Sequence, residues 1–137
     1  METLHRIAAA CGYALDIRPH RIPRLSDVGD AAGDDTADWT PMRLAVDYAF
    51  RHPEHADVVC AEPLGVSERA RTLMGAVAER MANMLGIVPP AWAQQCPALD
   101  EPWEHPGTAK MRLENRRMAP PEFARRNIWL RADGIFR

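Results

Sequence analysis

The sequence has few cysteines, the residues that stabilise many small folds through disulfides or bound zinc. The number of cysteines, three, is odd, which excludes a complete disulfide framework. No two of them form a Cys-x-x-Cys motif, which excludes the paired ligands typical of structural zinc sites. No apolar run approaches the roughly 18 residues of a membrane-spanning helix, and the first residues lack the apolar core of a secretory signal. We therefore expect a cytoplasmic protein with no membrane partner.

Sequence motifs of common catalytic and nucleotide-binding sites are missing as well. The only serines are Ser26 and Ser67, and neither lies in a Gly-x-Ser-x-Gly motif. None of the eight glycines forms a Gly-x-Gly-x-x-Gly or Gly-x-x-x-x-Gly-Lys loop. We therefore predict no enzyme activity, no cofactor, and no catalytic, cofactor-binding or metal-ligating residue.

What the sequence does contain is typical of a small globular protein. Its 137 residues are 47% hydrophobic and 26% charged, and the formal net charge is −2. The two signs of charge are separated along the chain: residues 26–39 are rich in aspartate and contain no cation, whereas the C-terminal quarter is rich in arginine. The acidic stretch has few large apolar residues, so we predict a solvated linker over 26–39.

The spacing of apolar residues predicts a mainly α fold, a small irregular helical domain with a short N-terminal helix-strand remnant. The predicted helices cover residues 3–10, a segment that Thr40 caps and Pro41 opens, a short segment from Pro53 through Cys60, a long segment between Ser67 and Gly86, and residues 108–118 and 120–126. Extended segments are predicted at 13–17 and 128–130, and residues 87–107 are predicted to be irregular, with Trp92 and Trp103 as apolar anchors.

The longest predicted helix has a continuous apolar stripe at helical spacing. The stripe consists of Ala70, Leu73, Met74, Val77, Ala78, Met81, Met84 and Leu85. Methionine-rich surfaces also occur as promiscuous binding grooves. In a chain this short, we predict that the stripe is buried as the core face.

The opening residues carry a more specific pattern. Residues 3–18 read TLHRIAAACGYALDIR and resemble the end of a repressor-type (Cro/repressor-like) helix-turn-helix domain, in which TLxRIAxAxGYxLxIR closes the last helix and continues into a short strand. The matching residues are Thr3, Leu4, Arg6, Ile7, Ala8, Ala10, Gly12, Tyr13, Leu15, Ile17 and Arg18. The later patterns W-x-x-M-R-L-A-V-D-Y-A-F-R-x-P, P-A-W, P-W and P-x-x-F-A-R-R-x-I resemble the C-terminal extension of actinobacterial helix-turn-helix regulators, some of them in toxin–antitoxin-like gene pairs.

This resemblance implies a truncated helix-turn-helix-like domain at 1–25, followed by the linker and a helical companion domain at 40–137. The recognition helix that precedes the motif in the family is not in this chain, so DNA binding is expected only through that missing reader or nonspecifically. Apolar side chains that would pack on the reader are expected to bind a protein instead. They are Leu4, Ile7, Tyr13 and Leu15.

The implied function is therefore a non-enzymatic transcriptional-regulator or antitoxin-like module that acts through protein–protein interaction. The expected partner is a protein such as a neighbour-encoded toxin, and a homodimer is a further expectation. A second hypothesis is nonspecific binding of nucleic acid, or of an acidic partner, through the arginine-rich quarter. The candidate contacts are Arg116, Arg117, Arg125 and Arg126.

A third hypothesis is a small metal-binding protein or enzyme. His52, His55 and Cys60 offer zinc-type donors, to which Cys96 or His105 could add a fourth. The pattern contains no close cysteine pair, and a polar residue before Pro53 also suits a helix cap. The sequence therefore favours the cap over the metal site.

Overall fold

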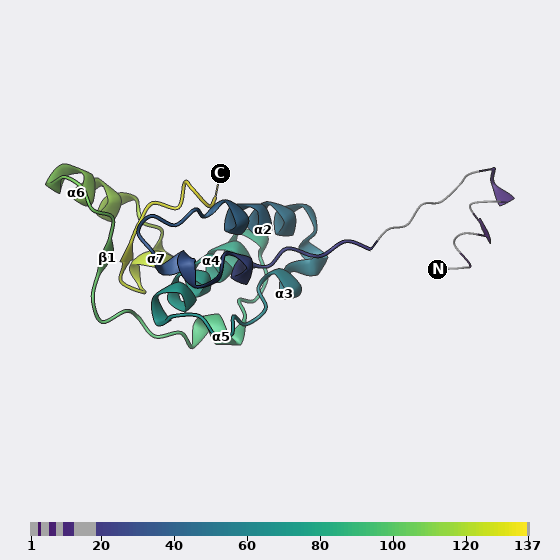
Figure 1. Ribbon diagram of the computed structural model, residues 1–137, viewed down its shortest axis with the longest axis horizontal. Helices are drawn as coiled ribbons and strands as arrows, with labels where there is room; N and C mark the ends of the chain where they lie inside the picture. Colours follow the sequence, from purple (N-terminus) through teal and green to yellow (C-terminus); the bar gives the residue numbers. More distant parts are fainter. Residues whose placement is uncertain (1–2, 4–5, 8–9, 13–18, 137) are drawn as a thin grey trace.

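The computed structural model describes residue 3 and residues 6–7, 10–12 and 19–136. In this part of the chain the fold is mainly α, as predicted (Figure 1). In chain order the elements are the 3-10 helix η1 (Leu25–Gly33), α2 (Thr40–Arg51), the 3-10 turn η2 (Pro53–His55), α3 (Ala56–Val59), α4 (Glu68–Leu85), α5 (Ala91–Gln94), β1 (Trp103–Glu104), α6 (Ala109–Met118), α7 (Pro121–Ala124) and β2 (Ile128–Trp129).

Helix α4 forms the centre of the molecule, and both of its ends follow the sequence signals. The Ser67 hydroxyl accepts a hydrogen bond from the Ala70 backbone N–H (3.2 Å), and Gly86 ends the helix with a left-handed φ of 70°. The predicted apolar stripe is buried from Ala70 to Met81, and Leu85 is partly buried against the core. The prediction for Met84 is wrong, because this side chain is 51% exposed.

Neighbouring elements cover α4 on several sides. It contacts η1, α5 and α7, while α2 packs on η1 and α3. In the view of Figure 1, α4 lies between α2 and α5. The C-terminal segment adds Phe123, Ile128, Leu130 and Ile135 to the same core, each fully buried. The core that surrounds α4 therefore extends from Leu25 to the C-terminal segment.

The acidic segment is not the solvated linker that the sequence predicts at 26–39. Most of it forms η1, which packs against α4 and α2. Leu25, Ala32 and Gly33 are buried there, and Gly29 turns the chain inside η1 with a φ of 67°. Burial of these small and apolar residues makes the segment part of the core.

The aspartates of this segment act as anchors, which explains their density. Asp30 accepts a hydrogen bond from the backbone N–H of Ser67, and this contact lowers the pKa of the Asp30 carboxyl. Asp35 accepts from Arg69 Nη2 (3.0 Å) and from Trp103 Nε1 (2.8 Å). The acidic segment is therefore tied to the start of α4 and to β1.

The two short strands form a parallel pair in which Trp103 aligns with Ile128. The strand at Ile128 confirms the predicted extended segment, whereas β1 lies in the stretch predicted to be irregular. Trp103 is 1% exposed and Trp92 is partly buried, so both contribute to the core as predicted. Helices α6 and α7 lie in the connection between the strands.

At the N-terminus, the described residues include part of the predicted helix at 3–10. Residues 3, 6–7 and 10 are helical, and the Cys11 backbone N–H donates to the Ile7 carbonyl (3.1 Å), in agreement with the predicted helix at 3–10. The predicted strand at 13–17 lies outside the described residues. Within the described residues, no helix has both the length and the apolar composition needed to cross a membrane.

Candidate protein-interaction surface

Among the helices α2 to α7, α6 alone has no buried residue. Its ends are nevertheless defined by local sequence. The Thr108 hydroxyl accepts a hydrogen bond from the Met111 backbone N–H (3.2 Å), and Pro120 and Pro121 follow the last turn. Figure 1 shows α6 at one end of the molecule, away from α2, α3 and α5. The protein therefore presents a complete helix that its own core does not use.

One side of α6 contacts β2, and Arg116 links it to both strands. Arg116 Nε donates to Glu104 Oε1 (2.6 Å), and the guanidinium lies over the Trp129 ring, 4.6 Å from its centroid. Glu104 belongs to β1 and Trp129 to β2, so this side chain connects α6 to both strands. The predicted nucleic-acid contact at Arg116 is thus already engaged within the chain.

The outer side of α6 combines apolar and basic groups. Its shallow hollow is lined by Lys110, Leu113, Glu114, Arg117 and Met118. Leu113 is 62% exposed and Met118 is 54% exposed. In the part of the chain that the structure describes, Lys110 and Arg117 form no ion pair with a carboxylate. We call these five residues the outer face of α6.

The prediction that Arg126 contacts nucleic acid is wrong, because this side chain is 2% exposed. Its Nη2 donates to Glu79 Oε2 (2.7 Å) and to the Ala93 carbonyl (2.7 Å), and Nη1 donates to the Glu122 carbonyl (2.8 Å). Arg125 also donates to Glu79. The buried carboxylate of Glu79 on α4 therefore accepts hydrogen bonds from both arginines, and Arg125 and Arg126 connect α4 to the C-terminal segment.

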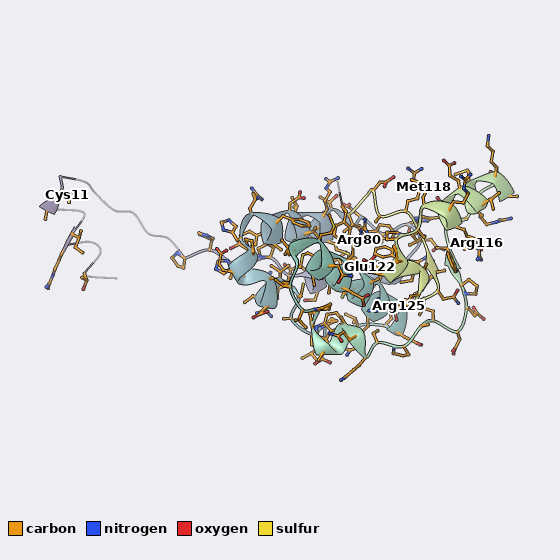
Figure 2. All side chains as sticks on the ribbon, turned by 180° about the vertical axis from the view of Figure 1, so that it is seen from behind. Cys11, Arg80, Arg116, Met118, Glu122 and Arg125 are labelled. Atoms are coloured by element: carbon orange, nitrogen blue, oxygen red, sulfur yellow. The ribbon has the colours of Figure 1, made fainter. Side chains whose placement is uncertain are left out.

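A second carboxylate extends this connection between α4 and α7. Glu122 accepts hydrogen bonds from Asn83 Nδ2 (3.1 Å) and Arg80 Nη1 (3.3 Å). Burial raises the pKa of the Glu122 carboxyl, but the hydrogen bonds from Asn83 and from its own backbone N–H, together with Arg80, outweigh burial and lower it. Figure 2 shows Arg80, Glu122 and Arg125 together, apart from Arg116 on α6. The four predicted arginines therefore do not form one surface.

The predicted N-terminal interaction residues are described at one position. Ile7 is 56% exposed. Leu4, Tyr13 and Leu15 lie outside the described residues, so the surface they would form stays a prediction. Figure 2 shows Cys11, four residues after Ile7, apart from the helical body.

Of the predicted zinc-type donors, the structure brings His52 and His55 together but not Cys60. One donor atom each from His52, Glu54 and His55 lies within 4.8 Å of the others. Cys60 is 4% exposed, and burial, with a smaller contribution from Asp57, raises the pKa of its thiol to about 12. Cys60 is therefore a core residue, and the donor that sequence reasoning missed is Glu54. The signal was the H-P-E-H string itself, since a proline between the histidines indicates a tight turn.

Comparison of the chain with protein-family models, with curated proteins and with solved structures found no significant match.

Proposed function

We propose that the protein is a non-enzymatic module of the transcriptional-regulator or antitoxin-like kind, and that it acts by binding a protein partner through α6. The observation that carries this proposal is the outer face of α6. Its apolar side chains are more than half exposed on a well-capped helix, so they contribute little to the core and are free to contact a partner. Apolar positions along one helix face are the anchors of helix-in-groove recognition.

The composition of the outer face defines the chemistry of the partner. Leu113 and Met118 require an apolar groove, and the aliphatic stem of Arg117 adds to the same contact area. On the helix surface Lys110 and Arg117 lie between these two anchors, and within the described residues neither forms an ion pair with a carboxylate. We therefore infer that the occupant is a partner protein whose apolar groove also presents carboxylates.

Nucleic acid fits this surface less well. Arg126 is buried, Arg125 is paired with Glu79, and Arg116 is paired with Glu104, so three of the four proposed phosphate contacts are already engaged within the chain. Exposed leucine and methionine offer phosphate no hydrogen bond. These observations favour a protein partner over a nucleic acid.

The regulator or antitoxin-like part of the proposal is supported by the resemblance of residues 3–18 to the end of a helix-turn-helix domain and by the exposure of Ile7. In a complete relative, the N-terminal segment would connect to a DNA-reading domain, as the resemblance implies, and α6 would bind the partner. In this chain, which does not contain the recognition helix, the proposed activity is the binding of a protein partner through α6. The natural first partner to test is the protein encoded by the adjacent gene.

The experiment measures calorimetrically the affinity of that neighbour-encoded protein for the wild-type chain and for a Leu113→Glu, Met118→Glu double variant. We expect the double variant to bind at least about tenfold more weakly, since loss of anchors at an interface typically costs more than about 1.4 kcal/mol. Leu44→Glu is the matched control, because Leu44 is 53% exposed on α2 and lies outside the outer face. Its affinity should equal that of the wild type.

Three outcomes would contradict the proposal. Equal affinity of the double variant would remove α6 from the interface. A wild-type chain that is a monomer by light scattering and does not bind the neighbour-encoded protein would remove the function. Binding of a random DNA duplex that falls steeply with salt, and is lost in an Arg116→Ala, Arg117→Ala variant, would establish the nucleic-acid hypothesis instead.

A further inference from the structure

The turn that follows α2 gathers three donor side chains on the surface. His52 leaves the helix with a φ of −132° and a ψ of 68°, and Pro53 opens η2 directly after it. Because proline fixes its own φ near −65°, the backbone reverses within a few residues. This reversal brings one nitrogen of His52, one nitrogen of His55 and a carboxylate oxygen of Glu54 within 4.8 Å of one another.

We propose that His52, Glu54 and His55 bind a divalent transition-metal ion of the Zn²⁺, Ni²⁺ or Cu²⁺ type. Two imidazoles and one carboxylate form a donor set that these ions prefer over Ca²⁺ or Mg²⁺. His52 Nδ1 lies 3.5 Å from Glu54 Oε1. Two ligands at about 2.0–2.1 Å from a tetrahedral zinc ion are about 3.3 Å apart, so this pair is already close to the required separation.

Tyr48 holds the third ligand in place. Its hydroxyl lies 2.8 Å from His55 Nδ1, and its ring packs against His52 at a tilt of 34° with a centroid distance of 4.5 Å. Metal-bound histidines typically donate their second ring N–H to an oxygen acceptor. With Nδ1–H of His55 donating to the tyrosine oxygen, Nε2 is left for the ion. Tyr48 is therefore a positioning residue for this site.

The site is accessible from solvent and separate from α6. The side chains of His52 and Glu54 are 46% and 63% exposed, so an ion can enter and rotamer adjustments need no change in the core. Figure 1 shows α3, which directly follows η2, at the end of the helical body opposite α6. Metal binding therefore does not compete with a partner on the outer face of α6.

The test titrates ZnCl₂ and, separately, NiCl₂ into tag-free protein by calorimetry. All variants carry Cys11→Ser, because Cys11 is an exposed free cysteine and a thiolate is itself a metal ligand. We expect one ion per chain, and binding at least about tenfold weaker in a His52→Ala, His55→Ala variant. His20→Ala is the matched control, since His20 is an exposed histidine outside the turn, and its affinity should equal that of the parent.

Two further variants distinguish ligands from positioning residues. Glu54→Gln should weaken binding, since a neutral amide is a poorer donor for these ions than a carboxylate. Tyr48→Phe should lower the affinity by about tenfold, the size expected when the partner of a metal-bound histidine is removed, and Co²⁺ absorption spectra should show the altered coordination. A purely structural tyrosine would leave both measurements unchanged.

The proposal is overturned if the parent shows no saturable binding of either ion, or if the double histidine variant binds as tightly as the parent. It stands independently of the role of α6. The His52→Ala, His55→Ala variant should retain its full affinity for the protein partner, whereas the Leu113→Glu, Met118→Glu variant should retain its full affinity for zinc.

Discussion

Helices α4 and α6 both contain methionine, leucine and several arginines, yet α4 is largely buried and α6 is exposed. Helix α4 is lined with alanine and glycine, so other elements can approach it closely. At Gly75, for example, an added Cβ would lie 3.5 Å from Cys96 Cβ and 3.6 Å from Arg126 Nε. Helix α6 has long charged side chains and only one alanine. Small residues therefore determine which helix the core surrounds.

The comparison assigns different roles to chemically similar side chains. Glu79, Arg80 and Leu73 on α4 stabilise the fold, whereas Glu114, Arg117 and Leu113 on the outer face of α6 are available to a partner. Paired substitutions on the two helices test this assignment, and the largest effects are expected where a charge is buried.

Glu79→Ala should cause the largest loss, about 3–5 kcal/mol in the free energy of unfolding, because it leaves Arg126 buried without its carboxylate. The matched change on α6 is Glu114→Ala, which should stay within about 0.5 kcal/mol of the wild type. Urea unfolding measures both variants. If the two substitutions had equal effects, Glu79 would not have the structural role described.

Leu73→Ala should cost about 2–5 kcal/mol, since Leu73 is fully buried in α4 and its removal leaves a cavity. The same substitution on α6, Leu113→Ala, should change the unfolding free energy by no more than about 0.5 kcal/mol. Guanidinium unfolding provides the comparison. A large loss at Leu113 would show that α6 contributes to the core and would weaken its assignment as a docking element.

Gly33→Ala should cost about 1–3 kcal/mol and tests whether η1 packs tightly on α4. The added Cβ would lie 3.2 Å from the Ala70 backbone nitrogen, which cannot move aside because it belongs to α4 and donates to Ser67. Gly134→Ala is the control, because a Cβ there meets nothing within 4 Å. Thermal unfolding of the two variants should therefore differ, and identical midpoints would contradict the packing of η1.

The smallest effect concerns the dependence of stability on pH. The pKa of Glu122 is lowered in the folded chain, so its contribution to stability is complete above its ordinary pKa of 4.5 and is lost as the pH falls through the lowered value. The stability difference between the wild type and Glu122→Gln should therefore shrink below about pH 4.5. Urea unfolding at a series of pH values measures it. A difference that stays constant into the acid range would exclude this role of Glu122.

The sequence was sufficient to predict elements whose ends are determined locally. Ser67 and Gly86 delimit α4, and Thr108 delimits α6, because a cap acts on backbone groups within a few residues. The mainly α class follows from the same signals. The remaining errors concern residues whose partners are distant in sequence.

The packing of the acidic segment is such a case. Asp30 pairs with a residue 37 positions later and Asp35 with one 68 positions later, so the local pattern shows only charge. Arg126 resembles Arg117 in sequence, as the second member of an arginine pair, but only the fold places Glu79 opposite it.

The position of the candidate surface in the sequence was predictable, but its exposure was not. Sequence periodicity located the helix at 108–118, but its exposure depends on which elements the core leaves uncovered. A sparse set of apolar residues among the cations of AKMRLENRRM was the available signal. For the donor cluster, His52 and His55 were identified, while Glu54 was overlooked in favour of the buried Cys60.

Hydrogen exchange of the wild-type chain with and without the neighbour-encoded protein tests the central claim most directly. The account predicts that the backbone amides of α6 exchange more slowly in the complex, while those of α4, already protected by burial, change little. A complex that forms while exchange in α6 stays the same would contradict the claim that this helix is the docking element.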